Sequence, residues 1–183
     1  MEGSTLPPPY DAIEYEPNGK NLFLFPMIRM IAACARNRVM GAGGTLPWKI
    51  EEDWNYFMQT TKDGVLLMGR KCYEDFTDYA PTRKLVVLSR NQEKTFDHAL
   101  KASTLQEAIQ LGWTMGKNLW ICGGEEIYRK AMPLAEELYL TLIDEDFEGD
   151  VHFPHWQKYF TEEISRREII CDGKKLTFLI LGK

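Results

Sequence analysis

The chain has 183 residues, of which 44% are hydrophobic and 27% are charged, which is the size and composition of one soluble globular domain with a sizeable core. Its formal net charge of −5 at pH 7 argues against non-specific binding to nucleic acid. No apolar run approaches the roughly 20 residues of a membrane-spanning helix, so we expect no membrane partner.

The first 26 residues differ in character from the rest of the chain. They contain the run Pro7-Pro8-Pro9 and one short apolar cluster, Leu22-Phe-Leu-Phe25. Such a composition is typical of irregular chain, and acidic residues such as Asp11 are unlike a signal or transit peptide. We therefore expect 1–26 to be an irregular N-terminal extension and 27–183 to form a single domain.

Five apolar runs of strand length follow the extension, and they lack the polar–apolar alternation of a half-exposed strand. Continuous runs of this kind are typical of strands buried on both faces of a parallel sheet. Helical segments lie between them; a Ser103/Gln106 capping box begins the second, Gly112 ends it, and Pro133 follows the third. We predict strands at 30–35, 65–69, 85–89, 118–124 and 138–144, and helices at 70–76, 103–111 and 125–132.

The C-terminal part has a different order. Two strand-like runs, 162–170 and 175–181, are joined by Cys171-Asp-Gly-Lys174, and Asp-Gly between strands is a hairpin signal. The predicted fold class is therefore α/β, with a mostly parallel central sheet, a C-terminal antiparallel hairpin and helices on both faces.

The glycine-rich loop Gly41–Trp48 leads directly into a helix-like run with one carboxylate in a distinctive place. Apolar residues recur at helical spacing along this run. They are Ile50, Trp54, Phe57, Met58 and Thr61. Glu51 and Glu52 point away from this stripe, where stabilisation by the helix dipole of about 0.3–1 kcal/mol accounts for them. Asp53 lies on its flank, and two interpretations stay open: the same dipole role, or a carboxylate turned toward an apolar pocket that needs a cationic or amidine-like ligand.

Basic residues and glycines follow the predicted strands at one edge of the sheet, where ligands of parallel sheets bind. Arg70-Lys71 follows the second strand, Ser89-Arg90 the third and Gly123-Gly124 the fourth. Each basic residue alone is typical of a solvated surface, but backbone amides and cations sharing one edge favour a phosphate-type anion.

Two other patterns carry little weight. Gly41-x-Gly43-Gly44 lacks the third glycine of a dinucleotide-binding fingerprint. In His152-Phe-Pro-His155 the proline prevents a helix that would place both imidazoles on one face, and the four cysteines show neither CxxC nor Cys/His zinc spacing. We expect no metal site and, from cysteines in apolar runs, a cytoplasmic protein with reduced thiols.

Nine segments between Ile28 and Lys183, in the right order, resemble the dihydrofolate reductase family. They are Ile31-Ala-Ala33, Arg38-Val-Met-Gly41, Leu46-Pro-Trp48, Asp53, Met68-Gly-Arg70, Leu88-Ser-Arg90, Cys122-Gly-Gly124 with Ile127-Tyr128, Leu138-Tyr-Leu-Thr141 and Gly149-Asp-Val-His-Phe-Pro154. The resemblance implies a catalytic domain at 27–183 that reduces 7,8-dihydrofolate to tetrahydrofolate with NADPH, by hydride transfer to pterin C6 and protonation at N5. It further implies an antifolate target in one-carbon metabolism, which we expect to be a monomer.

On the substrate side the resemblance implies catalytic roles for Asp53 and Thr141. Asp53 would bind the amino and ring N–H groups of the pterin, and Thr141 would hydrogen-bond both the Asp53 carboxylate and the pterin. The backbone carbonyls of Ile31 and Cys122 would contact the pterin amino group, and Arg83 would pair with the glutamate tail. The implied substrate-binding residues are Ile31, Ala32, Asp53, Trp54, Phe57, Phe76, Arg83, Cys122, Tyr128 and Thr141.

On the cofactor side the resemblance implies that four residues surround the adenosine 2′-phosphate, namely Arg70, Lys71, Ser89 and Arg90. It also implies a cis peptide between Gly123 and Gly124, and a mobile lid, Gly41–Trp48, that Asp150 contacts from the side. The implied cofactor-binding residues are Ala33, Met40, Gly41, Gly43, Gly44, Thr45, Trp48, Gly69, Arg70, Lys71, Cys72, Ser89, Arg90, Gly123, Gly124, Glu125, Glu126, Ile127 and Tyr128.

The sequence departs from the family pattern at a few positions. Cys72 replaces a threonine beside the cofactor pyrophosphate, and a thiol is a weaker hydrogen bonder. Cys122 replaces an isoleucine or valine, Leu46 replaces a methionine, and 77–82 lacks the usual proline- and glycine-rich wall for the folate tail.

Two rival interpretations remain. A reductase of riboflavin biosynthesis shares the fold and NADPH but does not use a Pro-Trp loop followed by a pocket aspartate, so Asp53 argues against it. A folate- or NADPH-binding relative without turnover is the other, and the intact Asp53, Trp48 and Thr141 argue against that.

Overall fold

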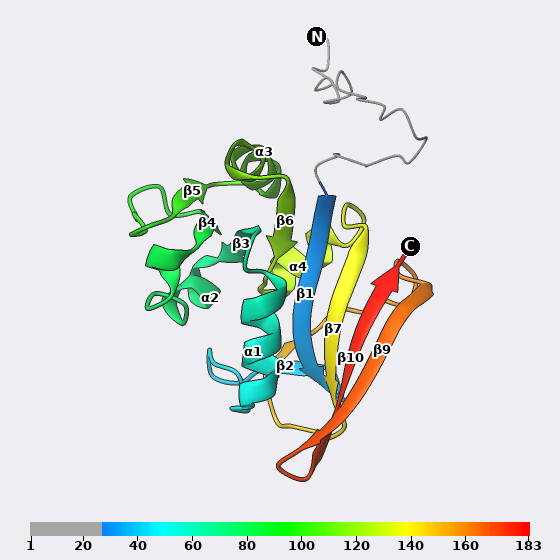
Figure 1. Ribbon diagram of the computed structural model, residues 1–183. Coiled ribbons are helices and arrows are strands. Elements are labelled where there is room, and N and C mark those ends of the chain that lie inside the picture. The colour runs from blue at the N-terminus through cyan, green and yellow to red at the C-terminus, as the bar shows by residue number, and fades with distance from the viewer. Residues whose placement is uncertain (1–26) are drawn as a thin grey trace, which may run out of the picture.

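The computed structural model describes residues 27–183, so the predicted extension at 1–26 lies outside the described residues. Within them, eight strands form one sheet in the order β5-β4-β3-β6-β1-β7-β10-β9 (Figure 1). The strands are β1 (Met27–Ala35), β3 (Val65–Gly69), β4 (Lys84–Leu88), β5 (Leu100–Ala102), β6 (Asn118–Ile121), β7 (Glu137–Ile143), β9 (Glu162–Cys171) and β10 (Lys174–Gly182).

The directions of the strands confirm the predicted fold class. The neighbours from β5 across to β7 pair in parallel, whereas β10 is antiparallel to both β7 and β9. The predicted Asp-Gly turn joins β9 to β10, with Asp172 at φ 49° and Gly173 at φ 74°. Two consecutive residues with positive φ are what a two-residue hairpin turn requires.

Three short strands have no counterpart in the predictions. Besides β5, these are β2 (Val39–Gly41) and β8 (Val151–His152), which pair antiparallel as a separate small sheet next to the Gly41–Trp48 loop. Strands of two or three residues are too short for a period of apolar residues to reveal them.

The helices of the described residues are α1 (Glu51–Thr60), α2 (Arg70–Glu74), α3 (Leu105–Met115) and α4 (Glu125–Ala131), with a 3₁₀ turn at Ala80–Thr82. None of these helices is long and apolar enough to cross a bilayer.

The predicted boundaries of α3 were wrong at both ends. The capping residue is Thr104, whose hydroxyl accepts a hydrogen bond from the Glu107 N–H at 3.1 Å, while the Glu107 carboxylate accepts from the Ser103 N–H at 2.7 Å. The helix is thus capped one residue later than predicted, and Glu107 bonds the N–H of Ser103 rather than that of the capping residue itself, as a capping box would require. Gly112 lies inside the helix, where a Cβ would come within 2.9 Å of Leu119, so it permits close packing on the sheet rather than ending the helix.

The apolar strands explain why helices cover both faces of the sheet. Successive residues of β1 point to opposite sides of the sheet: Met30 packs in the cluster that contains α3 and α4, and Ile31 in the cluster that contains α1 and α2. Both side chains are at most 4% exposed, and this double burial is what the continuous apolar runs predict.

Gly64, between α1 and β3, is buried so tightly that we expect Gly64→Ala to destabilise the fold. A Cβ would overlap the Trp120 ring and approach the Asn118 carbonyl to 3.2 Å, and overpacking of this kind costs about 1–3 kcal/mol. Chemical denaturation should show that loss, with Gly116→Ala as the control, since its Cβ would meet Val65 only at 3.2 Å. Equal midpoints for the two variants would contradict the expectation.

Candidate active site

A cavity of about 1130 Å³ opens at the carboxyl ends of β1, β3 and β6, between α1 and the Gly41–Trp48 loop. It brings together most of the predicted site residues. Those that line it are Ile31, Ala32, Ala33, Met40, Gly41, Gly44, Thr45, Trp48, Asp53, Trp54, Phe57, Lys71, Cys72, Phe76, Cys122, Gly123, Gly124, Glu125, Glu126, Tyr128 and Thr141.

Seven predicted site residues do not line this cavity within the described part of the chain. They are Gly43, Gly69, Arg70, Arg83, Ser89, Arg90 and Ile127. Some support its wall from behind: Gly69 donates its N–H to the Gly123 carbonyl at 2.8 Å, and a Cβ on Gly69 would meet Ile127 at 3.2 Å.

Asp53 projects from the first turn of α1 into the cavity. No residue of α1 is fully buried: Trp54 and Phe57 line the cavity, while Met58 packs against the neighbouring core cluster. Burial raises the pKa of Asp53 from 3.8 to about 6, and the nearby Thr141 hydroxyl and Trp48 indole N–H, which favour the charged carboxylate, only partly offset this. Of the two interpretations of this carboxylate, the structure favours the pocket-facing one.

Thr141 and Trp48 flank the carboxylate from opposite elements. Thr141 lies at the middle of β7 and is 1% exposed. Trp48, the last residue of the loop, has a buried Nε1 without a hydrogen-bond partner of standard geometry among the described residues, although it is near enough to lower the pKa of Asp53. A buried donor left unpaired costs about 1–3 kcal/mol, so the site is built to receive another polar group.

The raised pKa of Asp53 makes stability depend on pH. A carboxyl that binds its proton more tightly in the folded state contributes stability that is fully present below its unfolded pKa, near 3.8, and is lost as pH rises through about 6. We therefore expect Asp53→Asn to have the same unfolding free energy as the parent near pH 3 and to exceed it by about 1–2 kcal/mol at pH 7.5, after a discount for exposure to the cavity. Urea denaturation of both proteins across this range measures the difference; a constant or reversed difference would contradict the assignment.

The two neighbouring glutamates behave differently from each other. Glu52 faces the C-terminal hairpin, where its carboxylate accepts a hydrogen bond from the Cys171 thiol at 2.7 Å. Glu51 was expected to point away from the pocket, and that was wrong, because it borders the mouth of the cavity while remaining exposed. The 100° step of a helix places Glu51 away from the apolar stripe. The cavity is also bordered by the Gly41–Trp48 loop, and the periodicity of a helix gives no information about where such a loop lies.

Backbone carbonyls at the strand ends offer acceptors. The Ile31 carbonyl accepts a hydrogen bond from the Tyr128 hydroxyl at 2.6 Å and, with two lone pairs, can accept a second. Tyr128 itself is buried, and burial raises its pKa well above 10, so the hydroxyl remains a donor.

Part of the cavity wall is a cluster of aromatic rings. The Trp54 ring lies 5.6 Å from Phe57, 6.0 Å from Phe76 and 4.9 Å from Tyr79. Tyr79 belongs to the 77–82 stretch that lacks the family's proline- and glycine-rich sequence, and the predictions missed it. The sequence of 77–82 left it open whether this stretch forms a wall of the cavity. In the structure the Tyr79 ring lines the cavity there.

Gly123 and Gly124 are joined by a cis peptide, as the resemblance implied. Gly123 has φ 115°, and a Cβ there would meet the Cys72 sulfur at 3.2 Å. Burial raises the pKa of Cys72 to about 11, so this thiol stays neutral beside the glycine pair.

Two cations of the predicted phosphate site, Arg70 and Arg90, lie close to carboxylates in the structure. Arg70 donates to both carboxylate oxygens of Glu74, at 2.9 and 3.0 Å, and Lys94 reaches the same carboxylate at 2.6 Å. Arg90 lies 3.9 Å from Glu126 and its side chain is 91% exposed. The predictions missed Glu74 and Lys94; the i,i+4 spacing of Arg70 and Glu74 was a signal that could have found the first.

Arg83 lies behind the aromatic wall. Its Nη2 donates to the Thr61 hydroxyl at 2.7 Å and to the Met58 carbonyl at 3.0 Å. Its Nε is buried without a partner among the described residues, so the guanidinium is anchored at one end and retains an unused donor.

The Gly41–Trp48 loop, which we call the lid, is held at its tip by Asp150. Asp150 accepts a hydrogen bond from the Gly43 N–H at 3.1 Å and donates its own N–H to the Gly41 carbonyl at 3.0 Å. Gly43 and Gly44 have φ 59° and 97°, values that glycine adopts readily. The expected contact between Asp150 and the lid is therefore present.

Comparisons with known proteins agree with this geometry. The family model described as dihydrofolate reductase matches residues 27–182. Dihydrofolate reductase of Neisseria gonorrhoeae is 36% identical over 163 residues, covering 85% of this chain and 98% of that protein, and the enzyme of Bacillus subtilis is 32% identical over 148 residues, covering 81% and 88%. Among solved structures, dihydrofolate reductase from Enterococcus faecalis, complexed with NADP(H) and RAB-propyl, superposes with a TM-score of 0.79 at 25% identity, covering 86% of this chain and 97% of that one. With Asp53 in an apolar cavity behind a glycine-rich lid, and with this match over nearly all of the described residues, the chain belongs to the dihydrofolate reductase family.

Proposed function

We propose that this protein reduces 7,8-dihydrofolate to tetrahydrofolate with NADPH, and that Asp53 and Thr141 are the catalytic pair. The observation that carries the proposal is the Asp53 carboxylate, which projects into a predominantly apolar cavity, has its pKa raised to about 6 by burial, and is flanked by the Thr141 hydroxyl and the Trp48 indole N–H.

The substrate side of the proposal follows from the donors that a pterin presents. Its amino and ring N–H groups form a pair of parallel donors that suits a carboxylate, and such charge-assisted pairs are among the stronger hydrogen bonds. The Ile31 carbonyl and the backbone of Cys122 accept from the amino group at the strand ends. The aromatic rings of Trp54 and Phe57 then cover the apolar part of the ligand, and Arg83 is the cation for its glutamate tail.

NADPH fits the other half of the cavity. The glycine pair Gly123-Gly124 has no side chains to obstruct a pyrophosphate, and Lys71 lies on the same wall. Glu125 and Glu126 also lie there, but Arg129 and Lys130 pair with them and reduce their repulsion toward phosphate. When bound, NADPH supplies the hydride that the protein's own side chains cannot provide.

The protein's residues orient the substrate, exclude water and favour protonation. The net reaction consumes one NADPH and one proton for each dihydrofolate, so the pterin must gain a proton at N5 as well as the hydride. Protonation at N5 gives the pterin a positive charge. An ionised Asp53 in an apolar pocket stabilises this charge more than it would in water. Closure of the lid over the cavity excludes water during the step.

We further propose that residues 27–183 form the catalytic domain, that the protein acts as a monomer, and that it is cytoplasmic. The family match at 27–182 supports the domain bounds, and four cysteines without disulfide bonds are consistent with a reducing compartment.

A spectrophotometric assay at the absorbance of NADPH tests the function. Purified protein should oxidise NADPH rapidly with dihydrofolate and negligibly without it, and product analysis should identify tetrahydrofolate. NADPH oxidation that does not depend on dihydrofolate, or binding of both ligands without turnover, would overturn the proposal in favour of another reductase or a binding protein.

A further inference from the structure

The segment from Asp144 to Asp150, which joins β7 to β8, supports the lid along its length. Besides the Asp150 contacts described above, Gly149 lies so close to the base of the lid that a Cβ there would overlap the Gly41 carbonyl. A movement of this segment would therefore move the lid.

Phe147, at the middle of the segment, connects it to the catalytic carboxylate. Its ring packs on Trp48, with 5.3 Å between ring centroids and 58° between the planes. Trp48 in turn lies beside Asp53 and influences its pKa. The position of Phe147 thus bears on the indole that closes the site.

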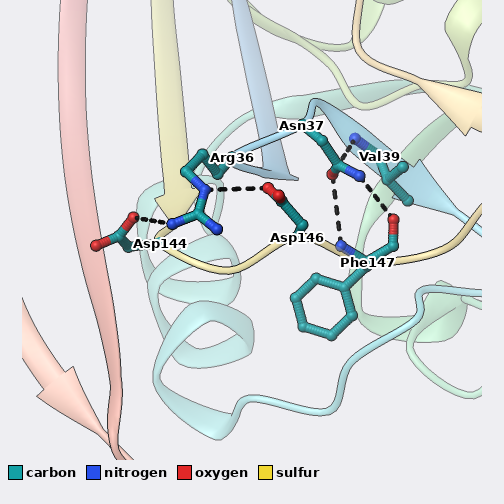
Figure 2. Close-up of polar contacts among 6 residues, drawn as sticks. All are labelled: Arg36, Asn37, Val39, Asp144, Asp146 and Phe147. Carbon is teal, nitrogen blue, oxygen red and sulfur yellow. Dashed lines mark hydrogen bonds and ion pairs between the residues drawn. The ribbon is translucent and has the colours of Figure 1, made fainter.

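Asn37, in the turn between β1 and β2, holds the backbone of Phe147 (Figure 2). Its Nδ2 donates to the Phe147 carbonyl at 2.8 Å, and its Oδ1 lies 3.5 Å from the Phe147 N–H and 3.4 Å from the Val39 N–H. Phe147 lies in a loop, so its backbone N–H and carbonyl have no neighbouring strand to pair with. The side-chain amide of Asn37 contacts both groups instead. The 2.8 Å bond is the strong member, because bonds near 3.5 Å are weak.

Arg36, the adjacent residue, contacts the same segment but with less consequence. Its guanidinium lies 3.3 Å from Asp144 and 3.1 Å from Asp146 (Figure 2), and all three side chains are more than half exposed. Ion pairs this exposed contribute at most about 1 kcal/mol. Arg36 also does not touch the residue that packs on Trp48, which makes it a matched control.

We propose that Asn37 is a positioning residue for the reaction: by fixing the Phe147 backbone, it keeps the Phe147 ring against Trp48 and the lid in the position that the structure shows. The inference rests on the proposed function. Asn37 does not line the cavity, so any effect on the reaction must pass through Phe147 and the lid.

Two variants of Asn37 test the role by rate. Asn37→Ala removes the amide, and Asn37→Asp keeps the size but replaces the donor to the Phe147 carbonyl. Each variant should lower kcat/KM for dihydrofolate about threefold to tenfold, because the net free energy of one hydrogen bond corresponds to a factor of that size. Arg36→Gln should keep kcat/KM within about twofold of the parent. Unchanged rates in both Asn37 variants would overturn the proposal.

Amide hydrogen exchange on the full chain distinguishes positioning from general destabilisation. The N–H groups of Gly43 and Asp150 report lid contacts, and that of Leu140 reports the core. In the Asn37 variants Gly43 and Asp150 should exchange about threefold to tenfold faster while Leu140 is unchanged. Equal acceleration at all three amides, or at none, would contradict a positioning role.

The route through Phe147 is tested by a double variant. In a Phe147→Ala background the ring no longer packs on Trp48, so adding Asn37→Ala should change the rate by less than about twofold; a full additional loss would show that Asn37 acts by another route. If the parent proved inactive with dihydrofolate, the proposed function would fail, whereas the exchange experiment would still decide whether Asn37 holds the lid.

Discussion

Asp53→Asn is expected to lower turnover of dihydrofolate by about two to four orders of magnitude at pH 7.5, the range typical of losing a group that assists proton transfer. Asparagine is close to isosteric, so the fold and the cavity should persist. What the variant lacks is the negative charge that stabilises a protonated pterin in an apolar pocket. The loss should shrink as the pH falls, because protonation of the substrate in solution then replaces part of what the carboxylate did.

Glu52→Gln is the matched control for that experiment. It removes a carboxylate from the adjacent position of α1, but Glu52 faces Cys171 rather than the cavity, so turnover should stay near that of the parent. The measurement is the steady-state rate of dihydrofolate reduction between pH 5 and 8 for the parent, Asp53→Asn and Glu52→Gln. An Asp53→Asn variant as fast as the parent would show that the catalytic assignment is wrong.

Arg70→Gln is expected to weaken the preference for NADPH over NADH by about 10–100-fold. Arg70 is proposed to contact the adenosine 2′-phosphate, and a hydrogen bond to a charged group is worth about 1.5–3 kcal/mol. NADH lacks that phosphate, so KM for NADPH should rise while KM for NADH stays constant. In the structure Arg70 is held by Glu74, which Lys94 also contacts, so the carboxylate keeps a partner in the variant and α2 should remain intact.

Arg166→Gln on β9 serves as the control for Arg70→Gln. Both arginines pair with a nearby glutamate, and their side chains are similarly exposed, at 41% and 48%, but β9 is at the far edge of the sheet (Figure 1). Kinetics with both cofactors should be unaffected in this control. A parallel rise in KM for NADPH and NADH in Arg70→Gln would mean that Arg70 does not read the 2′-phosphate.

The sequence predicted the features that a strong local pattern encodes. Continuous apolar runs identified the central strands, and Asp172-Gly173 identified the hairpin, because burial on both faces and positive φ each demand particular residues. Helical periodicity separated Asp53 from Glu52, but it did not predict that Glu51 borders the cavity. The site residues themselves came largely from the family resemblance.

What the sequence could not predict depends on contacts between distant segments. The short pairing of β2 with β8 and the hold of Asn37 on Phe147 join residues about 110 positions apart, and nothing in either local segment indicates the partner. Gly112 was mistaken for a helix stop because its signal is ambiguous: a glycine can end a helix or let it pack closely on a strand.

The most direct test of the account is a ¹³C NMR titration of the aspartate carboxyl groups in the free protein, with Asp53→Asn used to assign the resonance. The account predicts that the signal lost in this variant titrates near pH 6 in the parent, and that it titrates at a lower pH once folate is bound, because a paired carboxylate is favoured in its charged form. A carboxyl at position 53 that titrates near 3.8 in the free protein and does not respond to folate would contradict it.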